Sequence, residues 1–338
     1  MGTTPRTIHL LTGTNRTTAN RIPVVMCIDA EPEERMMALG ERPDWRGFER
    51  SHEYFNSLRL RLEEVTSEPA HFSWFFRMDP QIEQIYGTPN WSAERYRELI
   101  DQLRRAGDSL GLHVHTWRLD STTNKWVSEF ADQKWVEHCV RTAFEAFHES
   151  FGERCRYFRF GDHWMNNATV SLIDRLGAQV DLTIEPGQRG PTLPDPFTGS
   201  FVDYSNVPQH PYRPSRSDFT GRGTFLKRRI WMVPLSAGKS GSPQVAPNPD
   251  AASTSEEKDR SNTYFTLNLY DDSPTLCSIA DRLLERENPH LVMVVRSDVV
   301  LYPTFHANLQ RTFDHLLDHP LARQFVFCSP RKLVELLK

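Results

Sequence analysis

The chain has 338 residues, of which 25% are charged and 38% hydrophobic, so it is long enough to bury a large core without disulfide bonds. Its 40 Lys and Arg residues stand against 44 Asp and Glu residues, and this net charge of −4 provides no basic excess for general nucleic-acid binding. The five cysteines are widely spaced and contain no Cys-x-x-Cys motif, which favours a reducing compartment, with a reactive thiol as the alternative.

The sequence contains no evident targeting or membrane-spanning segment. Residues 1–22 form an N-terminal extension that lacks the apolar core of a secretory signal. No apolar run approaches the roughly 18 residues of a transmembrane helix. We therefore expect a cytoplasmic protein, or a mature enzyme without its leader, that has no membrane span.

Short apolar runs alternate with helix-like segments along the chain. The runs are rich in β-branched or aromatic residues and are bounded by polar residues, Gly or Pro, as is typical of buried parallel strands. They cover Pro23–Ile28, His71–Phe76, Leu112–His115, Tyr157–Phe160, Val180–Ile184, Ile230–Val233 and Leu291–Val295. The segments between them predict helices over Ser51–Val65, Ala93–Leu110, Gln133–Phe151, Ala168–Leu176, Pro274–Glu287 and Thr304–Leu317.

This alternation predicts one α/β domain over residues 23–338, a single (β/α) barrel, with a doubly wound open sheet as the alternative. Two insertions interrupt it, at about residues 185–226 and 236–262. The first is rich in Pro and Gly and is expected to cover or line a site. The second is of low complexity and is expected to be a surface insertion.

Two carboxylates directly follow the first predicted strand. Asp29 and Glu31 are two residues apart, and such residues point the same way on an extended segment. In a barrel, catalytic side chains gather at the carboxyl ends of the strands. Neighbouring carboxylates repel each other, which raises one pKa for base chemistry or requires a cation between them. A solvated acidic loop is the alternative, because Glu33 and Glu34 follow.

A pair of histidines ends the third predicted strand. His113 and His115 share one face, which is the geometry for two imidazoles on one metal ion. Buried structural histidines are the alternative. Together with Asp29 and Glu31, the pair matches two His ligands, a carboxylate and an open position, the pattern of a hydrolytic zinc centre.

An arginine between two aromatic residues ends the fourth predicted strand. Arg159 is placed to hold a catalytic carboxylate through bidentate hydrogen bonds, whereas an ordinary surface ion pair is the alternative. Asp162 and His163 follow directly and are further candidates, although the sequence does not define where they point.

Two later segments supply candidates for substrate binding. Tyr212 and Arg213 lie in a Pro-framed turn of the first insertion, and such a rigid turn suits contact with a polar ligand. Arg296 and Asp298 follow the last predicted barrel strand, where a barrel site would need polar residues. Helix capping explains Asp298 equally well.

In their order along the chain, these segments resemble the polysaccharide deacetylase superfamily, the NodB-type enzymes of carbohydrate esterase family 4. The resemblance extends from about Val24 to Leu337 and is carried by VVMCIDAEPE, GLHVHTWR, FRFGDHW followed by LIDRLGAQVDLTI, PYRPS and LVMVVRSD. It implies an incomplete, seven-stranded (β/α) barrel that holds one divalent metal ion, usually zinc. Enzymes of this family remove N- or O-acetyl groups from carbohydrates.

The resemblance also implies roles for single residues. Asp29 looks like the general base of the family, and Arg159 looks like the arginine that steadies that base. Glu31 looks like the metal-binding carboxylate, in place of the more usual Asp, and His113 matches the first metal-binding histidine.

Three features depart from the family's pattern. Trp117 stands where the second metal-binding histidine is usual, so His115 takes that role in our prediction and Trp117 becomes a substrate-binding candidate. The late general-acid histidine is replaced by Arg296–Asp298, which leaves His163 or His306 as the candidate acid. The family is largely secreted or envelope-associated, whereas this chain shows no signal.

The leading hypothesis is a metal-dependent deacetylase that acts on a carbohydrate or another acetylated small molecule, with one zinc ion. The alternatives are a hydrolase of another non-peptide carbon–nitrogen bond and an inactive, sugar-binding barrel. The chain lacks a Gly-x-Ser-x-Gly elbow, a Walker-type phosphate loop and a Gly-x-Gly-x-x-Gly after the first strand. These absences exclude the serine hydrolase, nucleoside-triphosphatase and dinucleotide dehydrogenase classes.

Overall fold

One parallel sheet forms the centre of the molecule. The computed structural model describes residues 21–188, 202–239 and 264–338, so residues 1–20 of the predicted extension and parts of both predicted insertions lie outside the described residues. The sheet has the strand order β11–β1–β2–β3–β6–β7–β8, and β12 pairs with β1. The strands are β1 (Ile22–Ala30), β2 (Ser73–Arg77), β3 (Ser109–Val114), β6 (Tyr157–Phe160), β7 (Val180–Asp181), β8 (Trp231–Met232), β11 (Leu291–Arg296) and β12 (Phe325–Phe327).

The sheet curls until its two ends meet. After β8, the Leu235 amide donates a hydrogen bond to the carbonyl of Ile184, at 2.9 Å. The next amide, that of Ser236, donates to the carbonyl of Val292 in β11, also at 2.9 Å. Irregular backbone therefore closes a ring that regular strands leave incomplete. The predicted distorted (β/α) barrel is confirmed, and the sheet is not the alternative open one.

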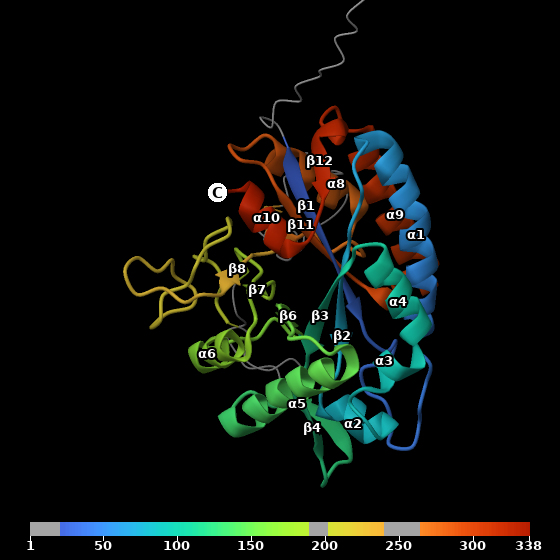
Figure 1. Ribbon diagram of the computed structural model, residues 1–338, viewed down its shortest axis with the longest axis vertical. Coiled ribbons are helices and arrows are strands. Elements are labelled where there is room, and N and C mark those ends of the chain that lie inside the picture. The colour runs from blue at the N-terminus through green and yellow to red at the C-terminus, as the bar shows by residue number, and fades with distance from the viewer. Residues whose placement is uncertain (1–20, 189–201, 240–263) are drawn as a thin grey trace, which may run out of the picture.

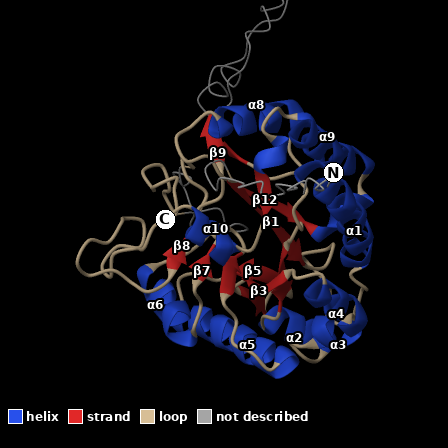
Figure 2. Ribbon diagram, turned by 45° about the horizontal axis from the view of Figure 1, so that its top comes forward, coloured by secondary structure: helices blue, strands red, loops and turns tan. Residues whose placement is uncertain are grey.

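Helices surround the strands on the outside (Figure 1, Figure 2). They are α1 (Arg46–Thr66), α2 (Pro80–Tyr86), α3 (Trp91–Arg95), α4 (Arg97–Arg105), α5 (Gln133–Phe151), α6 (Asn167–Leu176), α8 (Ser273–Leu284) and α9 (Pro303–Asp318), whereas α10 (Pro330–Leu336) lies over the middle of the strands in Figure 2. The helix predicted over Ala93–Leu110 is divided into α3 and α4, and it ends early because Ser109 and Leu110 belong to β3. Among the described residues, no helix combines the length and the apolar character needed to cross a bilayer.

Local sequence signals set the helix ends. Asn166 caps α6, since its side chain accepts a hydrogen bond from the Thr169 amide at 2.8 Å. Gly177 ends the same helix with a φ of 110°, a conformation that glycine adopts without strain. Asn166 and Gly177 therefore define the two ends of α6.

Alternation along β1 separates two apolar layers. Val25 and Cys27 belong to a cluster inside the barrel, whereas Val24 and Met26 belong to the cluster under the outer helices. Asp29 continues the inward row, so polar groups replace apolar ones at the carboxyl end of the strand. This change of character positions the site described below.

Helix α10 closes the amino-terminal end of the barrel. Its residues Leu333 and Val334 are members of the inner apolar cluster, and Leu333 is completely buried. This helix was not predicted from the sequence; it is short and follows β12, a strand of only three residues that was also not predicted.

We expect Leu333→Ala to lower the free energy of unfolding by about 2–5 kcal/mol, since it leaves a cavity in the inner core. Leu60→Ala is the matched control, because Leu60 is 68% exposed on α1 and its removal should cost less than about 0.5 kcal/mol. Chemical denaturation of both variants measures the difference. Equal losses would show that α10 does not support the barrel.

Candidate metal centre and active site

Charged side chains occupy the carboxyl end of the barrel in one layer. The pairing of the strands places His113 opposite both Arg77 and Arg159, and Asp29 opposite Arg296. These three pairings involve strands β11, β1, β2, β3 and β6, so residues distant in sequence meet across a small interior. A pocket of about 50 Å³ opens there, and Asp29, Glu31, His113 and Arg159 line it.

Three of these residues fit a metal ion. His113 Nε2 and His115 Nε2 are 3.0 Å apart, and Glu31 Oε2 lies 3.9 and 3.5 Å from them respectively. Ligand atoms at about 2.0–2.2 Å from a tetrahedral ion are themselves about 3.3–3.6 Å apart. The three distances between the candidate ligand atoms, 3.0, 3.5 and 3.9 Å, lie on both sides of this range, and all three side chains are buried.

The polar atoms of this cluster lack ordinary partners. Three buried atoms make no well-formed hydrogen bond: the two carboxylate oxygens of Glu31 and the Nδ1 of His113. Arg296 Nε is 2.8 Å from Glu31 Oε1 and compensates the charge of this carboxylate, but the angle between the two groups does not allow a hydrogen bond. Buried polar atoms without partners are costly unless something else binds them. The donor set, one carboxylate and two imidazoles, is that of a divalent cation site.

Burial and neighbouring charges set the protonation of these ligands. Burial lowers the pKa of His113 to about 4, so its imidazole is neutral and offers a lone pair at neutral pH. Burial alone would raise the pKa of Glu31, but the Arg296 guanidinium and the His115 imidazole outweigh it and hold that pKa well below its usual value. Both residues are therefore in the state that binds a cation.

Asp162 orients His115. Its Oδ2 lies 2.9 Å from His115 Nδ1 and accepts a hydrogen bond of 2.6 Å from the Trp117 indole. Asp162 outweighs the effect of burial and raises the pKa of His115. A carboxylate on the outer nitrogen of a ligand histidine fixes its tautomer and its direction. The ring also lies against Gly161, where a Cβ atom would be 2.2 Å from His115 Cε1.

Asp29 and Arg159 form a buried pair beside the three candidate metal ligands. Arg159 Nε donates a 3.1 Å hydrogen bond to Asp29 Oδ2, and its Nη1 donates to the carbonyl of Leu182 at 2.8 Å. The other carboxylate oxygen, Oδ1, has no hydrogen-bond partner and is 3.8 Å from His113 Nδ1. One oxygen is thus held and the other faces the pocket.

His163 lies on the opposite rim with a buried carboxylate. Its Nδ1 is 2.5 Å from Glu185 Oε1, and its side chain is 33% exposed. Glu185 is fixed by hydrogen bonds from Gln188 and Thr266, at 2.7 and 3.0 Å. Burial alone would lower the pKa of His163, but Glu185 outweighs it and raises that pKa.

The structure does not bring all predicted site residues together. Arg296 lines the pocket and Trp117 supports Asp162, while Asp298 Oδ1 is 3.3 Å from Arg296 Nε. Tyr212 is buried elsewhere, and its hydroxyl donates to the carbonyl of Phe219 at 2.8 Å. Arg213 lines a separate hollow at the other end of the barrel.

Several residues of the site were not predicted. Arg77, at the end of β2, is completely buried and lies 3.9 Å from Glu31 Oε2. Its position at the carboxyl end of the second predicted strand is a signal that could have identified it. Glu185, Asn268 and Tyr270 stand in or beside the insertions, where no strand pattern marks them.

Comparisons with known proteins find similarity in structure only. No family model matches the chain, and no curated protein matches its sequence. The solved structures that resemble it include a "putative polysaccharide deacetylase" from Mycobacterium smegmatis, with 15% identity, a TM-score of 0.49 and coverage of 94% of this chain and 90% of that one. Puue allantoinase is 13% identical, with a TM-score of 0.49 and coverage of 94% of this chain and 90% of that one. A "probable polysaccharide deacetylase" from Pseudomonas aeruginosa is 13% identical, with a TM-score of 0.47 and coverage of 94% of this chain and 91% of that one.

We expect the protein, once stripped with a chelator, to bind one zinc ion and to lose that binding in His113→Ala. The affinity should fall by more than about 100-fold, because even outer partners of metal ligands contribute roughly 10–100-fold. Isothermal titration calorimetry with ZnCl₂ measures it. His148→Ala is the control, because His148 is exposed on α5. Unchanged stoichiometry and affinity in His113→Ala would exclude this site.

Proposed function

We propose that the protein is a metal-dependent hydrolase that removes acetyl groups from a carbohydrate. One observation supports this most strongly: a Glu31–His113–His115 cluster and the free Oδ1 of Asp29 face the same small pocket at the carboxyl end of the barrel. Metal ligands beside an unpaired carboxylate are the arrangement that hydrolysis of an acyl group requires.

The residues of the chain divide the work of hydrolysis. A divalent ion bound by the cluster would polarise the acyl carbonyl and make water more acidic. Asp29 Oδ1 accepts the proton of the attacking water, and Arg159 holds the Asp29 carboxylate in place through its hydrogen bond to Oδ2. The walls of the pocket exclude bulk water, which strengthens each of these charge interactions.

His163 is the proposed general acid. Because Glu185 raises its pKa, the imidazole carries a proton that it donates to the leaving nitrogen or oxygen. Its partial exposure lets it reach a substrate at the rim, while Nδ1 remains on Glu185. His306, the other candidate acid, does not line the pocket.

An aromatic strip beside the pocket supports a sugar substrate. Tyr270 lines the pocket, and its ring centre is 5.7 Å from that of Phe305, which is 5.9 Å from that of Tyr302. Phe305 and Tyr302 are 42% and 44% exposed. Aromatic rings combine a flat apolar face with polar edges, and this suits the faces of a sugar ring.

We expect Asp29→Asn to lower kcat on an acetylated oligosaccharide by about 10²–10⁴-fold, the usual loss when a general base is removed. Zinc binding should persist, because Asp29 is not part of the proposed ligand set. Release of acetate measures the reaction, and calorimetry measures the metal. The matched control is Asp314→Asn, a change of an exposed carboxylate on α9.

An assay with a panel of substrates separates this proposal from its two alternatives. The panel contains acetylated oligosaccharides and cyclic amides, each assayed with zinc present. Turnover of cyclic amides alone would establish the hydrolase of another carbon–nitrogen bond. Binding of oligosaccharides without any acetate release would establish the inactive, sugar-binding barrel.

We expect kcat/KM to fall as the pH rises through the pKa of His163. The protonated acid is present below this pKa, and the pKa is raised above its usual 6.5 by Glu185. Glu185→Gln removes the raising charge and leaves the effect of burial, so the alkaline fall should move to lower pH. A pH–rate profile measures this shift, and an alkaline limb that stays in place would exclude His163 as the acid.

A further inference from the structure

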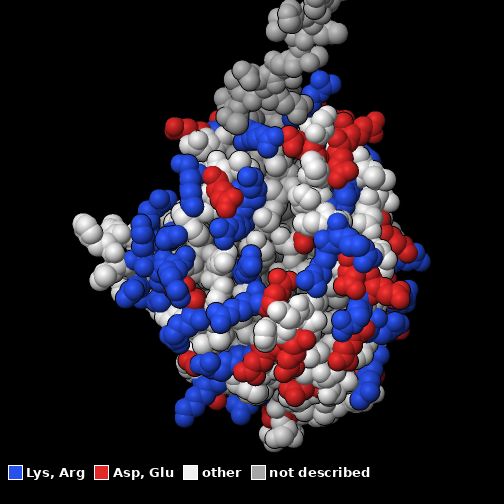
Figure 3. All heavy atoms as spheres, in the orientation of Figure 1, with Lys and Arg blue, Asp and Glu red and all other residues white. Residues whose placement is uncertain are grey.

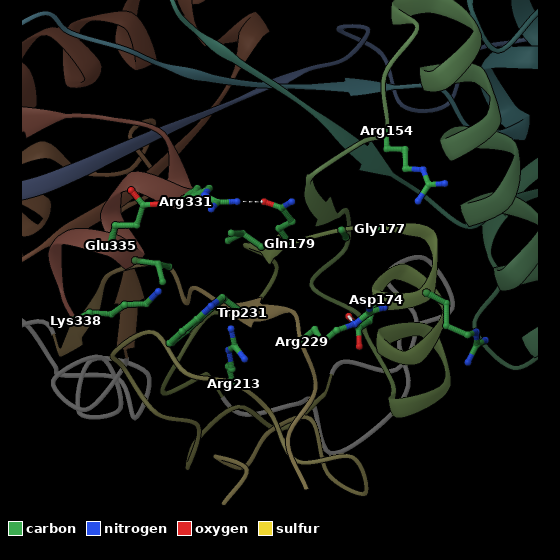
Figure 4. Close-up of a pocket in the computed structure, with 14 residues that line it drawn as sticks. Arg154, Asp174, Gly177, Gln179, Arg213, Arg229, Trp231, Arg331, Glu335 and Lys338 are labelled. Carbon is green, nitrogen blue, oxygen red and sulfur yellow. Dashed lines mark hydrogen bonds and ion pairs between the residues drawn. The ribbon is translucent and has the colours of Figure 1, made fainter. Parts of the chain in front are cut away.

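A second hollow lies at the end of the barrel opposite the metal centre. It has a volume of about 380 Å³ and forms where β7 and β8 begin, beside α6 and α10 (Figure 4). Its charged lining is Arg154, Arg175, Arg213, Arg229, Arg331 and Lys338 against Asp174 and Glu335. The chain as a whole has a net charge of −4, so this positive excess is local. Figure 3 shows Lys and Arg gathered on the left of the molecule, near the loops that Figure 1 draws in yellow.

The two carboxylates of the hollow are already paired. Asp174 Oδ1 lies 3.8 Å from Arg229 Nε, and Glu335 Oε1 lies 3.0 Å from Arg331 Nε. Asp174 is partly buried and the other three groups are exposed, so each pair compensates one positive charge of the hollow.

The remaining four cations have no carboxylate partner among the described residues. Arg213 and Lys338 place their charged groups 5.1 and 5.5 Å from the ring centre of Trp231, and Arg154 and Arg175 form no ion pair in this part of the structure. Like charges held together repel one another. An anion in the hollow would relieve that repulsion.

An apolar loop tip lies beside these cations. Phe225 is 99% exposed and the next residue, Leu226, is 69% exposed. Arg222 and Lys227 flank the tip and, together with Trp231, line an adjoining hollow of about 320 Å³. Large apolar side chains this exposed mark an interaction surface when they occur together.

Backbone hydrogen bonds hold this loop in place. The Gly223 amide donates to the carbonyl of Arg213 at 2.9 Å, and the Arg216 amide donates to the carbonyl of Leu226 at 3.1 Å. A Cβ atom at residue 223 would be 2.7 Å from the Cβ of Lys227, so glycine allows this close approach. The apolar tip and the basic hollow therefore form one surface of fixed shape.

We propose that this surface binds an anionic lipid bilayer, with Phe225 and Leu226 entering the boundary between headgroups and acyl chains. The cations around Trp231 contact the headgroup phosphates. A nucleic acid or a free polyanion would use the cations but would gain little from two bare apolar side chains, whereas a bilayer uses both features. This mode of attachment needs no helix that crosses the membrane.

The proposed surface and the metal centre share no residue. The surface lies where strands β7 and β8 begin, and the metal centre lies where strands β1 and β3 end. A bilayer bound to one end leaves the pocket at the other end open to a substrate. Binding to lipid is consequently independent of the hydrolase activity, and each is tested without the other.

Co-sedimentation with vesicles tests the proposal. The full chain should sediment with vesicles of equal parts phosphatidylcholine and phosphatidylglycerol but not with pure phosphatidylcholine, and added salt should weaken the binding. The double variant Phe225→Ser with Leu226→Ser should bind the anionic vesicles at least about 10-fold more weakly, since it loses the apolar insertion. Arg222→Glu with Lys227→Glu should also weaken binding.

Two controls and one competing ligand complete the experiment. Leu60→Ser removes an equally exposed leucine from α1 and should leave binding unchanged, as should Lys125→Glu on the distant β5 (Lys125–Ser128). Absence of binding to the anionic vesicles would overturn the proposal. So would unchanged vesicle binding by the Phe225–Leu226 variant, or single-stranded DNA binding as tightly as vesicles and responding only to the charge variant.

Discussion

A buried ion pair between Arg77 and Asp79 supports the whole site. Arg77 donates from Nε and Nη2 to the two oxygens of Asp79, each at 2.9 Å, and both residues are completely buried. Asp79 also accepts the amide of His115 at 3.1 Å and caps α2 through the Gln81 amide. One carboxylate thereby connects β2, β3 and α2. Removal of the Arg77 charge would leave Asp79 as an unpaired charge in the interior, a loss of about 3–5 kcal/mol.

The inward-facing residues of β1 differ in character between the two ends of the barrel. Toward the amino-terminal end, the inward positions of β1 carry Val25 and Cys27, and α10 seals them with Leu333. Toward the carboxyl end, the same row carries Asp29, and charged neighbours on the adjacent strands replace hydrophobic contact with ion pairs. The apolar half of the barrel stabilises the fold, and this stability compensates for the buried polar atoms of the other half that lack hydrogen-bond partners.

The sequence predicted those parts of the fold and site that follow from regular geometry. All seven predicted strands lie in the sheet, and His113 and His115 meet Glu31 at the carboxyl ends of the neighbouring strands β1, β2 and β3. Glu185 was missed because an irregular segment brings it beside His163, and no periodicity marks such a position. Tyr212 was predicted to contact a ligand because its turn is rigid, whereas in the structure the turn pairs with Met232 of β8 and the Tyr212 side chain is buried.

The loop after β6 joins the two halves of the proposed chemistry. Asp162 and His163 are consecutive, and both adopt a φ of 53°, a left-handed conformation that costs non-glycine residues roughly 1–3 kcal/mol. This backbone directs Asp162 to His115 and His163 to Glu185. A change that relaxed the loop would displace the carboxylate that orients His115 and the proposed proton donor together. The strained backbone therefore couples the orientation of His115 to that of His163.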